Sequence, residues 1–212
     1  MRIVCFLFCL LLPVRGETID RLAITVGNQV ITELQIDEEL RVTAVLNHET
    51  VVVRTLDARR GAADRLVEQF LIKFEMQLSR YALPESIEVD KYYQQIEEVN
   101  GGAADFEKTL RTLNLTPEVL RRHLELQLTE LKFIDVRFRP DVSVSDADIE
   151  TAYQAKIATW KQTHSGPPPT LDASRDSVRA MLVEDHTDNA LNTWLAESRK
   201  RMRIIYLDKT LQ

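Results

Sequence analysis

Two short β-rich segments lie at opposite ends of a chain whose remaining pattern is helical, and this arrangement limits the folds that the chain can form. Residues 22–32, LAITVGNQVIT, predict two strands around a tight turn. A two-stranded hairpin alone is at best marginally stable in water. Residues 203–207, RIIYL, are rich in β-branched and aromatic side chains and form the candidate third strand. We therefore predict a small antiparallel sheet that closes a helical domain; the alternative is an unpaired C-terminal tail.

Helical spacing of apolar residues dominates from Thr32 onward, and capping residues mark where helices begin. Thr32 and Gln35 form a capping box, Thr116-Pro117-Glu118 places a proline at the first helical position, and Ser145 caps a further helix. These signals indicate a mainly α fold. After the first helix, which begins at Thr32, the predicted helices cover about 57 or 64 to 81, 88–99, 105–113, 117–138, a segment from 145 through Trp160, and 172–201.

Residues 1–16 are typical of a cleavable export signal. Arg2 supplies a positive start, an apolar run follows, and Val14-Arg15-Gly16 places small residues at the recognition positions of a cleavage site. The apolar run is too short to span a bilayer, although an uncleaved anchor is the alternative. We therefore expect a periplasmic protein, or a secreted one, with no stable membrane insertion after cleavage.

Charge and cysteine content narrow the possible partners. Both cysteines, Cys5 and Cys9, lie within the predicted signal, so the exported chain would contain neither a disulfide nor a reactive thiol. Asp and Glu number 33 against 27 Lys and Arg, which gives a net charge of −6. A negatively charged surface disfavours nucleic acid and anionic lipid as partners.

Residue patterns that carry catalysis or bind cofactors are not found. The four histidines lack a second ligand at helical spacing, and no nucleophile elbow, phosphate-binding loop or dinucleotide glycine motif occurs. Asp146, Asp148 and Glu150 cluster, but acids at a helix start normally satisfy free backbone amides. We therefore predict no catalytic residue, no metal site and no cofactor, and hence a protein that is not an enzyme.

Two of the predicted helices carry more apolar residues than one buried face requires. Their main faces comprise Leu66, Val67, Phe70, Leu71, Phe74 and Leu78 in one helix, and Val119, Leu120, Leu124, Leu128, Leu131, Ile134 and Phe138 in the other. One interpretation is that neighbouring helices cover both sides of each helix. The other is a groove that binds apolar segments of other proteins. In that case the candidate client-binding residues, on the opposite sides of the two helices, are Ile72, Met76, Leu126, Phe133 and Val136.

Several of these segments together resemble a known family. Residues 24–32, ITVGNQVIT, followed by a helix that carries Asp37, are similar to the N-terminal domain of SurA-type periplasmic chaperones. Residues 113–118, LNLTPE, resemble the turn before that family's long helix, with Asn114 where glycine is usual. Residues 137–149, RFRPDVSVSDADI, resemble the start of the following helix, which PrsA-type foldases share. The last helix and residues 203–208 resemble the C-terminal piece that returns to the same domain, so the resemblance extends over nearly all of the chain after the signal.

The chain departs from that family at one point. Family members typically insert one or two parvulin prolyl isomerase domains between the helix that here contains Tyr153 and the last helix. Only a short segment separates these helices here, and it includes the proline-rich stretch GPPP at 166–169. An independent domain needs at least about 50 residues. We expect a signal at 1–16, a SurA-like helical domain at 17–162, a linker at 163–170 in place of the parvulin domain, and a helix and strand at 171–212 that pack back on the helical domain.

The resemblance implies an ATP-independent holdase, a chaperone that binds unfolded outer-membrane or secreted proteins in transit and releases them without ATP. Two alternatives remain open at the level of sequence. The same apolar surface would suit a scaffold that binds one specific partner. The chain would otherwise be a member of the prolyl isomerase family that has lost its catalytic domain.

Overall fold

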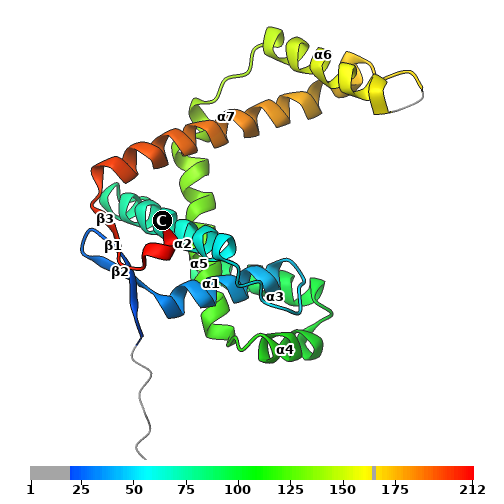
Figure 1. Ribbon diagram of the computed structural model, residues 1–212. Coiled ribbons are helices and arrows are strands. Elements are labelled where there is room, and N and C mark those ends of the chain that lie inside the picture. The colour runs from blue at the N-terminus through cyan, green and yellow to red at the C-terminus, as the bar shows by residue number, and fades with distance from the viewer. Residues whose placement is uncertain (1–19, 164–165) are drawn as a thin grey trace, which may run out of the picture.

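The computed structural model describes residues 20–163 and 166–212, so the predicted signal lies outside the described residues. The described part is mainly helical with one small sheet, which confirms the predicted fold class (Figure 1). The strands are β1 (Leu22–Val26), β2 (Gln29–Thr32) and β3 (Ile204–Tyr206). The α-helices are α1 (Glu33–Leu46), α2 (Leu56–Leu78), α3 (Ser86–Val99), α4 (Ala103–Thr112), α5 (Pro117–Arg137), α6 (Asp146–Thr163) and α7 (Leu171–Arg201), and two short 3-10 helices are η1 (Arg139–Asp141) and η2 (Lys209–Leu211).

The C-terminal strand completes the N-terminal hairpin, as predicted. The strand order is β2-β1-β3, and both neighbours run antiparallel to β1. Thr25 pairs with Ile205, and the backbone N–H of Gly27 donates to the carbonyl of Arg203 at 2.8 Å. Gly27 has a φ of +61°, which a residue without a Cβ adopts at little cost in a tight turn. The sheet therefore joins the first described residues to the last ones.

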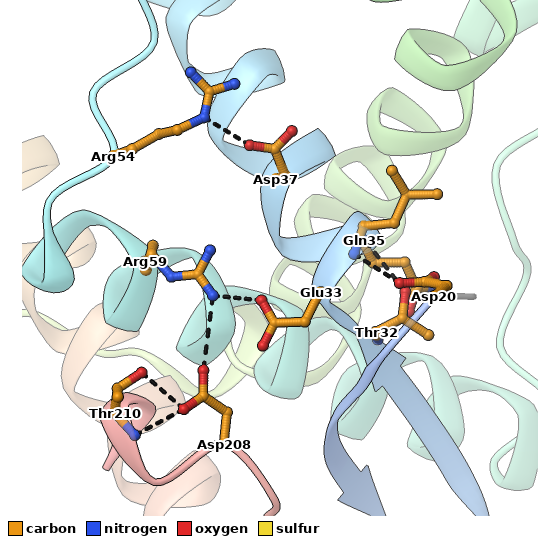
Figure 2. Close-up of polar contacts among 10 residues, drawn as sticks. Asp20, Thr32, Glu33, Gln35, Asp37, Arg54, Arg59, Asp208 and Thr210 are labelled. Atoms are coloured by element: carbon orange, nitrogen blue, oxygen red, sulfur yellow. Dashed lines mark hydrogen bonds and ion pairs between the residues drawn. The ribbon is translucent and has the colours of Figure 1, made fainter. Parts of the chain in front are cut away.

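The first helix begins at the predicted capping box. The backbone N–H of Gln35 donates to Thr32 Oγ1 at 3.3 Å, and Gln35 Oε1 accepts from the backbone N–H of Thr32 at 2.9 Å. Asp20 accepts a further backbone N–H, that of Leu34, at 3.1 Å. Figure 2 shows these side chains gathered where β2 leads into α1. Because these bonds satisfy amides that the helix leaves free, the local sequence fixes where α1 starts.

Polar contacts fasten the C-terminal residues to α1 and α2 (Figure 2). Arg59 of α2 forms ion pairs with Glu33 of α1 and with Asp208, which follows β3. Asp208 also accepts the backbone N–H of Thr210 at 2.9 Å, and Arg60 Nε donates to the Thr210 carbonyl at 2.9 Å. The C-terminal residues are thereby held against two helices from the start of the chain.

Two apolar cores share helices α1 and α5. The first lies among the sheet, α1, α2, the end of α5 and the second half of α7, and it contains Ile24, Phe133 and Trp194. The second lies among α1, α3, α4 and the start of α5, where Tyr93 and Phe106 pack edge to face with ring centroids 5.5 Å apart. Helix α5 therefore spans both cores and holds them in one body.

Helix α6 and the first half of α7 form a helical hairpin that projects from this body (Figure 1). Ile149, Ile157 and Val178 are buried between the two helices. Arg175 of α7 pairs with Asp146 at 2.8 Å, and the hydroxyl of Tyr153 donates to the Pro169 carbonyl at 2.8 Å. The rest of α7 packs on the body. Within the described residues, no helix has the length and apolar character needed to cross a bilayer.

Candidate functional site

The five residues proposed from sequence as a client-binding surface do not lie together on the surface. Ile72, Met76 and Phe133 are fully buried in the first core, so their assignment to an exposed groove is corrected. Helical periodicity identifies apolar faces but does not show which face a neighbour covers, and here all three side chains belong to the core that the sheet, α1, α2, α5 and α7 form. Leu126 lines a small pocket of about 170 Å³ between α1, α2 and α5. Val136 is 52% exposed on the surface of α5.

The main faces predicted from the sequence instead contain exposed residues. Leu131 of α5 is 53% exposed, and Phe74 and Leu78 near the end of α2 are also exposed. At these positions the structure reverses the expected assignment of buried and outer sides. The exposed residues on the two helices belong to different hollows, because Phe74 and Leu78 line a pocket beside α7 whereas Leu131 lines a larger one beside α3.

An open groove of about 570 Å³ lies between α3, α5 and the end of α1, and we call it the α3–α5 groove. Its apolar lining residues are Leu46, Tyr92, Ile96, Val99, Leu131 and Ile134. Its polar lining residues are His48, Gln95, Asn100, Gln127 and Glu130. A groove of this size with mostly apolar walls and a few polar groups is suited to an extended stretch of several side chains rather than to one small ion.

Ion pairs and hydrogen bonds hold the walls of the groove in place. Lys132 of α5 pairs with Glu88 of α3 at 2.6 Å, and Arg121 pairs with Asp90 at 3.0 Å. At the end of the groove, His48 Nδ1 lies 3.1 Å from Asn100 Oδ1, so the C-terminal ends of α1 and α3 are joined. Because these contacts fix the helices, a bound segment would meet a surface that is already formed.

Glu130 is the only acidic side chain that lines the α3–α5 groove. It is partly buried, and no hydrogen bond or ion pair of its carboxylate occurs within the described residues. Burial raises its pKa, and the nearby carboxylates of Glu68 on α2 and Glu39 on α1 raise it further. Those neighbours have partners of their own, since Glu68 pairs with Arg199 and Glu39 pairs with Arg65. Glu130 is therefore an acid whose charge the protein itself leaves uncompensated.

Other polar clusters have structural explanations. Glu39 lies 2.9 Å from Nδ1 of the buried His123, in a contact that joins α1 to α5 inside the fold. Asp148 accepts from the backbone N–H of Ser145 at 2.9 Å, which is the helix-start role expected from the sequence. In the described part of the chain, no cluster of three or more His, Cys, Asp or Glu side chains is placed to hold a metal ion.

Comparison with known proteins adds no family assignment. Neither the family models nor the curated proteins give a match to this chain. The resemblance to SurA-type chaperones therefore stays a hypothesis that rests on the motifs of the sequence.

Sequence reasoning missed the groove because it considered only the helices with the most apolar residues. Tyr92, Ile96 and Val99 of α3 follow the helical spacing i, i+4, i+7, beside the buried line of Val89, Tyr93 and Ile96. An apolar stripe this wide was a usable signal for a partly uncovered helix face. The local spacing of apolar residues does not predict where α5 lies relative to that stripe.

Replacement of Glu130 by Gln should stabilise the protein at neutral pH. When folding raises the pKa of an acid, the folded state loses stability as the pH rises and the acid ionises. A glutamine at the same position cannot ionise, so this loss does not occur. We expect the free energy of unfolding at pH 7.5 to rise by up to about 1 kcal/mol, and the gain to shrink toward pH 4, where the wild-type carboxyl is protonated. Urea unfolding at both pH values measures this. Glu98→Gln, at an exposed position outside the groove, is the matched control, and equal effects of the two variants would contradict the assignment.

Proposed function

We propose that this protein is an exported, ATP-independent holdase that binds unfolded segments of outer-membrane or secreted proteins in its α3–α5 groove. The observation that carries the proposal is the groove itself, an open hollow of about 570 Å³ with Leu131 half exposed on one wall and Val99 on the other. Exposed apolar surface in a hollow marks a binding site for apolar groups of a partner. Export is proposed from the signal-like residues 1–16, and the chaperone class from the SurA-like motifs of the sequence.

The geometry favours polypeptide as the ligand over a small molecule. The groove is open to solvent, and its lining includes the side-chain amides of Gln95 and Gln127. Such amides both donate and accept hydrogen bonds, so they can pair with the backbone of an extended chain without selecting one sequence. The proposal assigns no catalytic residue and no cofactor to the groove.

A matched pair of variants on α5 tests the groove as the client site. Leu131 and Val136 are 53% and 52% exposed, but only Leu131 lines the groove. With a client covering Leu131, Leu131→Gln should weaken binding by about 1–2 kcal/mol, or roughly five- to thirtyfold, whereas Val136→Gln should bind as wild type. The measurement is light scattering of several unrelated outer-membrane proteins diluted from denaturant, with each variant at near-stoichiometric ratio.

The outcomes distinguish a holdase that uses this groove from a holdase with another client site and from a scaffold for one partner. Protection of several clients that Leu131→Gln reduces supports a holdase that uses this groove. If Val136→Gln is the damaging change, the client site lies elsewhere on α5. If the folded protein protects none of the clients, the holdase proposal fails, and a scaffold for one specific partner becomes the better account.

A further inference from the structure

The lining of the α3–α5 groove carries a negative charge but no lysine or arginine. Its lining contains no Lys, Arg or Asp, and its titratable side chains are Glu130, His48 and Tyr92. The imidazole of His48 contacts Asn100, whereas the carboxylate of Glu130 has neither a hydrogen bond nor an ion pair within the described residues. A partly buried carboxylate without a partner has lost hydration without a compensating contact.

Two helix ends add to this negative character. Both α1, which ends at Leu46, and α3, which ends at Val99, terminate in the groove lining. The C-terminal end of a helix carries a partial negative charge, and basic residues in the last turn normally offset it. Neither α1 nor α3 has a basic residue in its last turn. A positive group placed in the groove would therefore meet Glu130 and the negative ends of two helices that carry no basic side chain in their last turns.

From this arrangement we propose that the α3–α5 groove selects apolar polypeptide segments that carry a lysine or arginine, whose cationic group pairs with Glu130. The inference rests on the proposed client-binding function and specifies its substrate class. Lysine and arginine fit because their long aliphatic stems can lie on apolar side chains while the charged head reaches an acid. In the groove the stem would lie against Leu131 or Ile134, which are one and four positions from Glu130 on α5.

Charge complementarity of this kind distinguishes clients that an apolar groove alone would not. An acidic residue at the same place would meet Glu130 and the two helix ends, and like charges in a partly buried site repel. The protein as a whole is acidic, with a net charge of −6, so basic segments are also attracted at longer range. The local effect of Glu130 has to be separated from this general attraction.

The test uses three fluorescent peptides that are identical except for one central residue, which is Lys, Gln or Glu between flanking Leu and Phe. Binding is measured by anisotropy with the wild-type protein, Glu130→Gln and Glu98→Gln. Both variants lose one negative charge, but Glu98 is exposed and does not line the groove. We expect the wild type to bind the Lys peptide about five- to tenfold more tightly than the Gln peptide, which is the range expected for a charged hydrogen bond that is partly desolvated. The Glu peptide should bind least tightly of the three.

Glu130→Gln should bind the Lys and Gln peptides equally, and Glu98→Gln should keep the wild-type preference. If the wild type binds the Lys and Gln peptides equally, the inference is overturned but the proposed function stands. This comparison uses the wild-type protein alone. Loss of the preference in both variants overturns the role of Glu130, because net charge alone would then explain it. Failure of the wild type to bind any of the three peptides overturns the proposed function together with the inference.

Discussion

Truncation after Met202 should destabilise the protein by about 3–5 kcal/mol, a large part of the roughly 5–15 kcal/mol that holds a typical domain together. The truncation removes β3 and with it the pairing of Thr25 with Ile205. It also removes Leu211, which is 4% exposed and packs in the first core. Full burial of one leucine contributes about 1.5–3 kcal/mol, and the half-buried Ile204 and Tyr206 add to this. Thermal and urea unfolding of the truncated chain against the full chain measure the loss.

A point variant of the same strand controls for this result. Ile205 is 37% exposed, and it lies between two more buried residues of a three-residue edge strand. Ile205→Asp should therefore cost at most about 1 kcal/mol, the span of strand preferences, because the carboxylate stays in water. If the truncated chain unfolds at the same temperature as the full chain, β3 does not hold the sheet. If Ile205→Asp is as damaging as the truncation, Ile205 faces the core and the observed register is wrong.

Local signals in the sequence were enough to predict where most elements begin and end. Thr32 with Gln35, and Thr116 before Pro117, cap their helices as predicted, because an N-cap acts on amides only two or three residues away. Asn114, which stands where the SurA-type motif usually has glycine, has a left-handed φ of +52°. The third strand was predictable as well, since a β-rich segment at the far end of a helical chain left few other partners for the hairpin.

The parts that depend on distant neighbours were not predictable in the same way. Leu131 and Phe133 are two positions apart on one helix, yet one is half exposed and the other is fully buried. The difference arises from Trp194 of α7, which covers Phe133 but lies far from it in sequence. The α6–α7 hairpin is a second example, because its helices pair through Ile149, Ile157 and Val178 rather than lying flat on the body. Apolar periodicity shows which residues share a face, and only packing shows what covers it.

Phe133→Ala should be the most damaging single substitution on α5, with a loss of about 3–5 kcal/mol in the free energy of unfolding. The ring of Phe133 is fully buried, with its centroid 4.8 Å from that of Trp194 and 5.4 Å from that of Phe138. Removal of the ring leaves a cavity where α5 meets α7, and two aromatic neighbours lose their contact with it. Urea unfolding followed by circular dichroism measures the loss.

Val136→Ala on the same helix is the control, because a half-exposed valine should change stability by less than about 0.5 kcal/mol. The pair decides between the two readings of α5 that the sequence left open. A large loss for Phe133→Ala means that the residue holds α7 to the body and cannot also be a client-binding side chain in the folded protein. Equal, small effects of the two substitutions would mean that Phe133 is accessible in solution, and the surface assignment made from the sequence would then replace the one argued from packing.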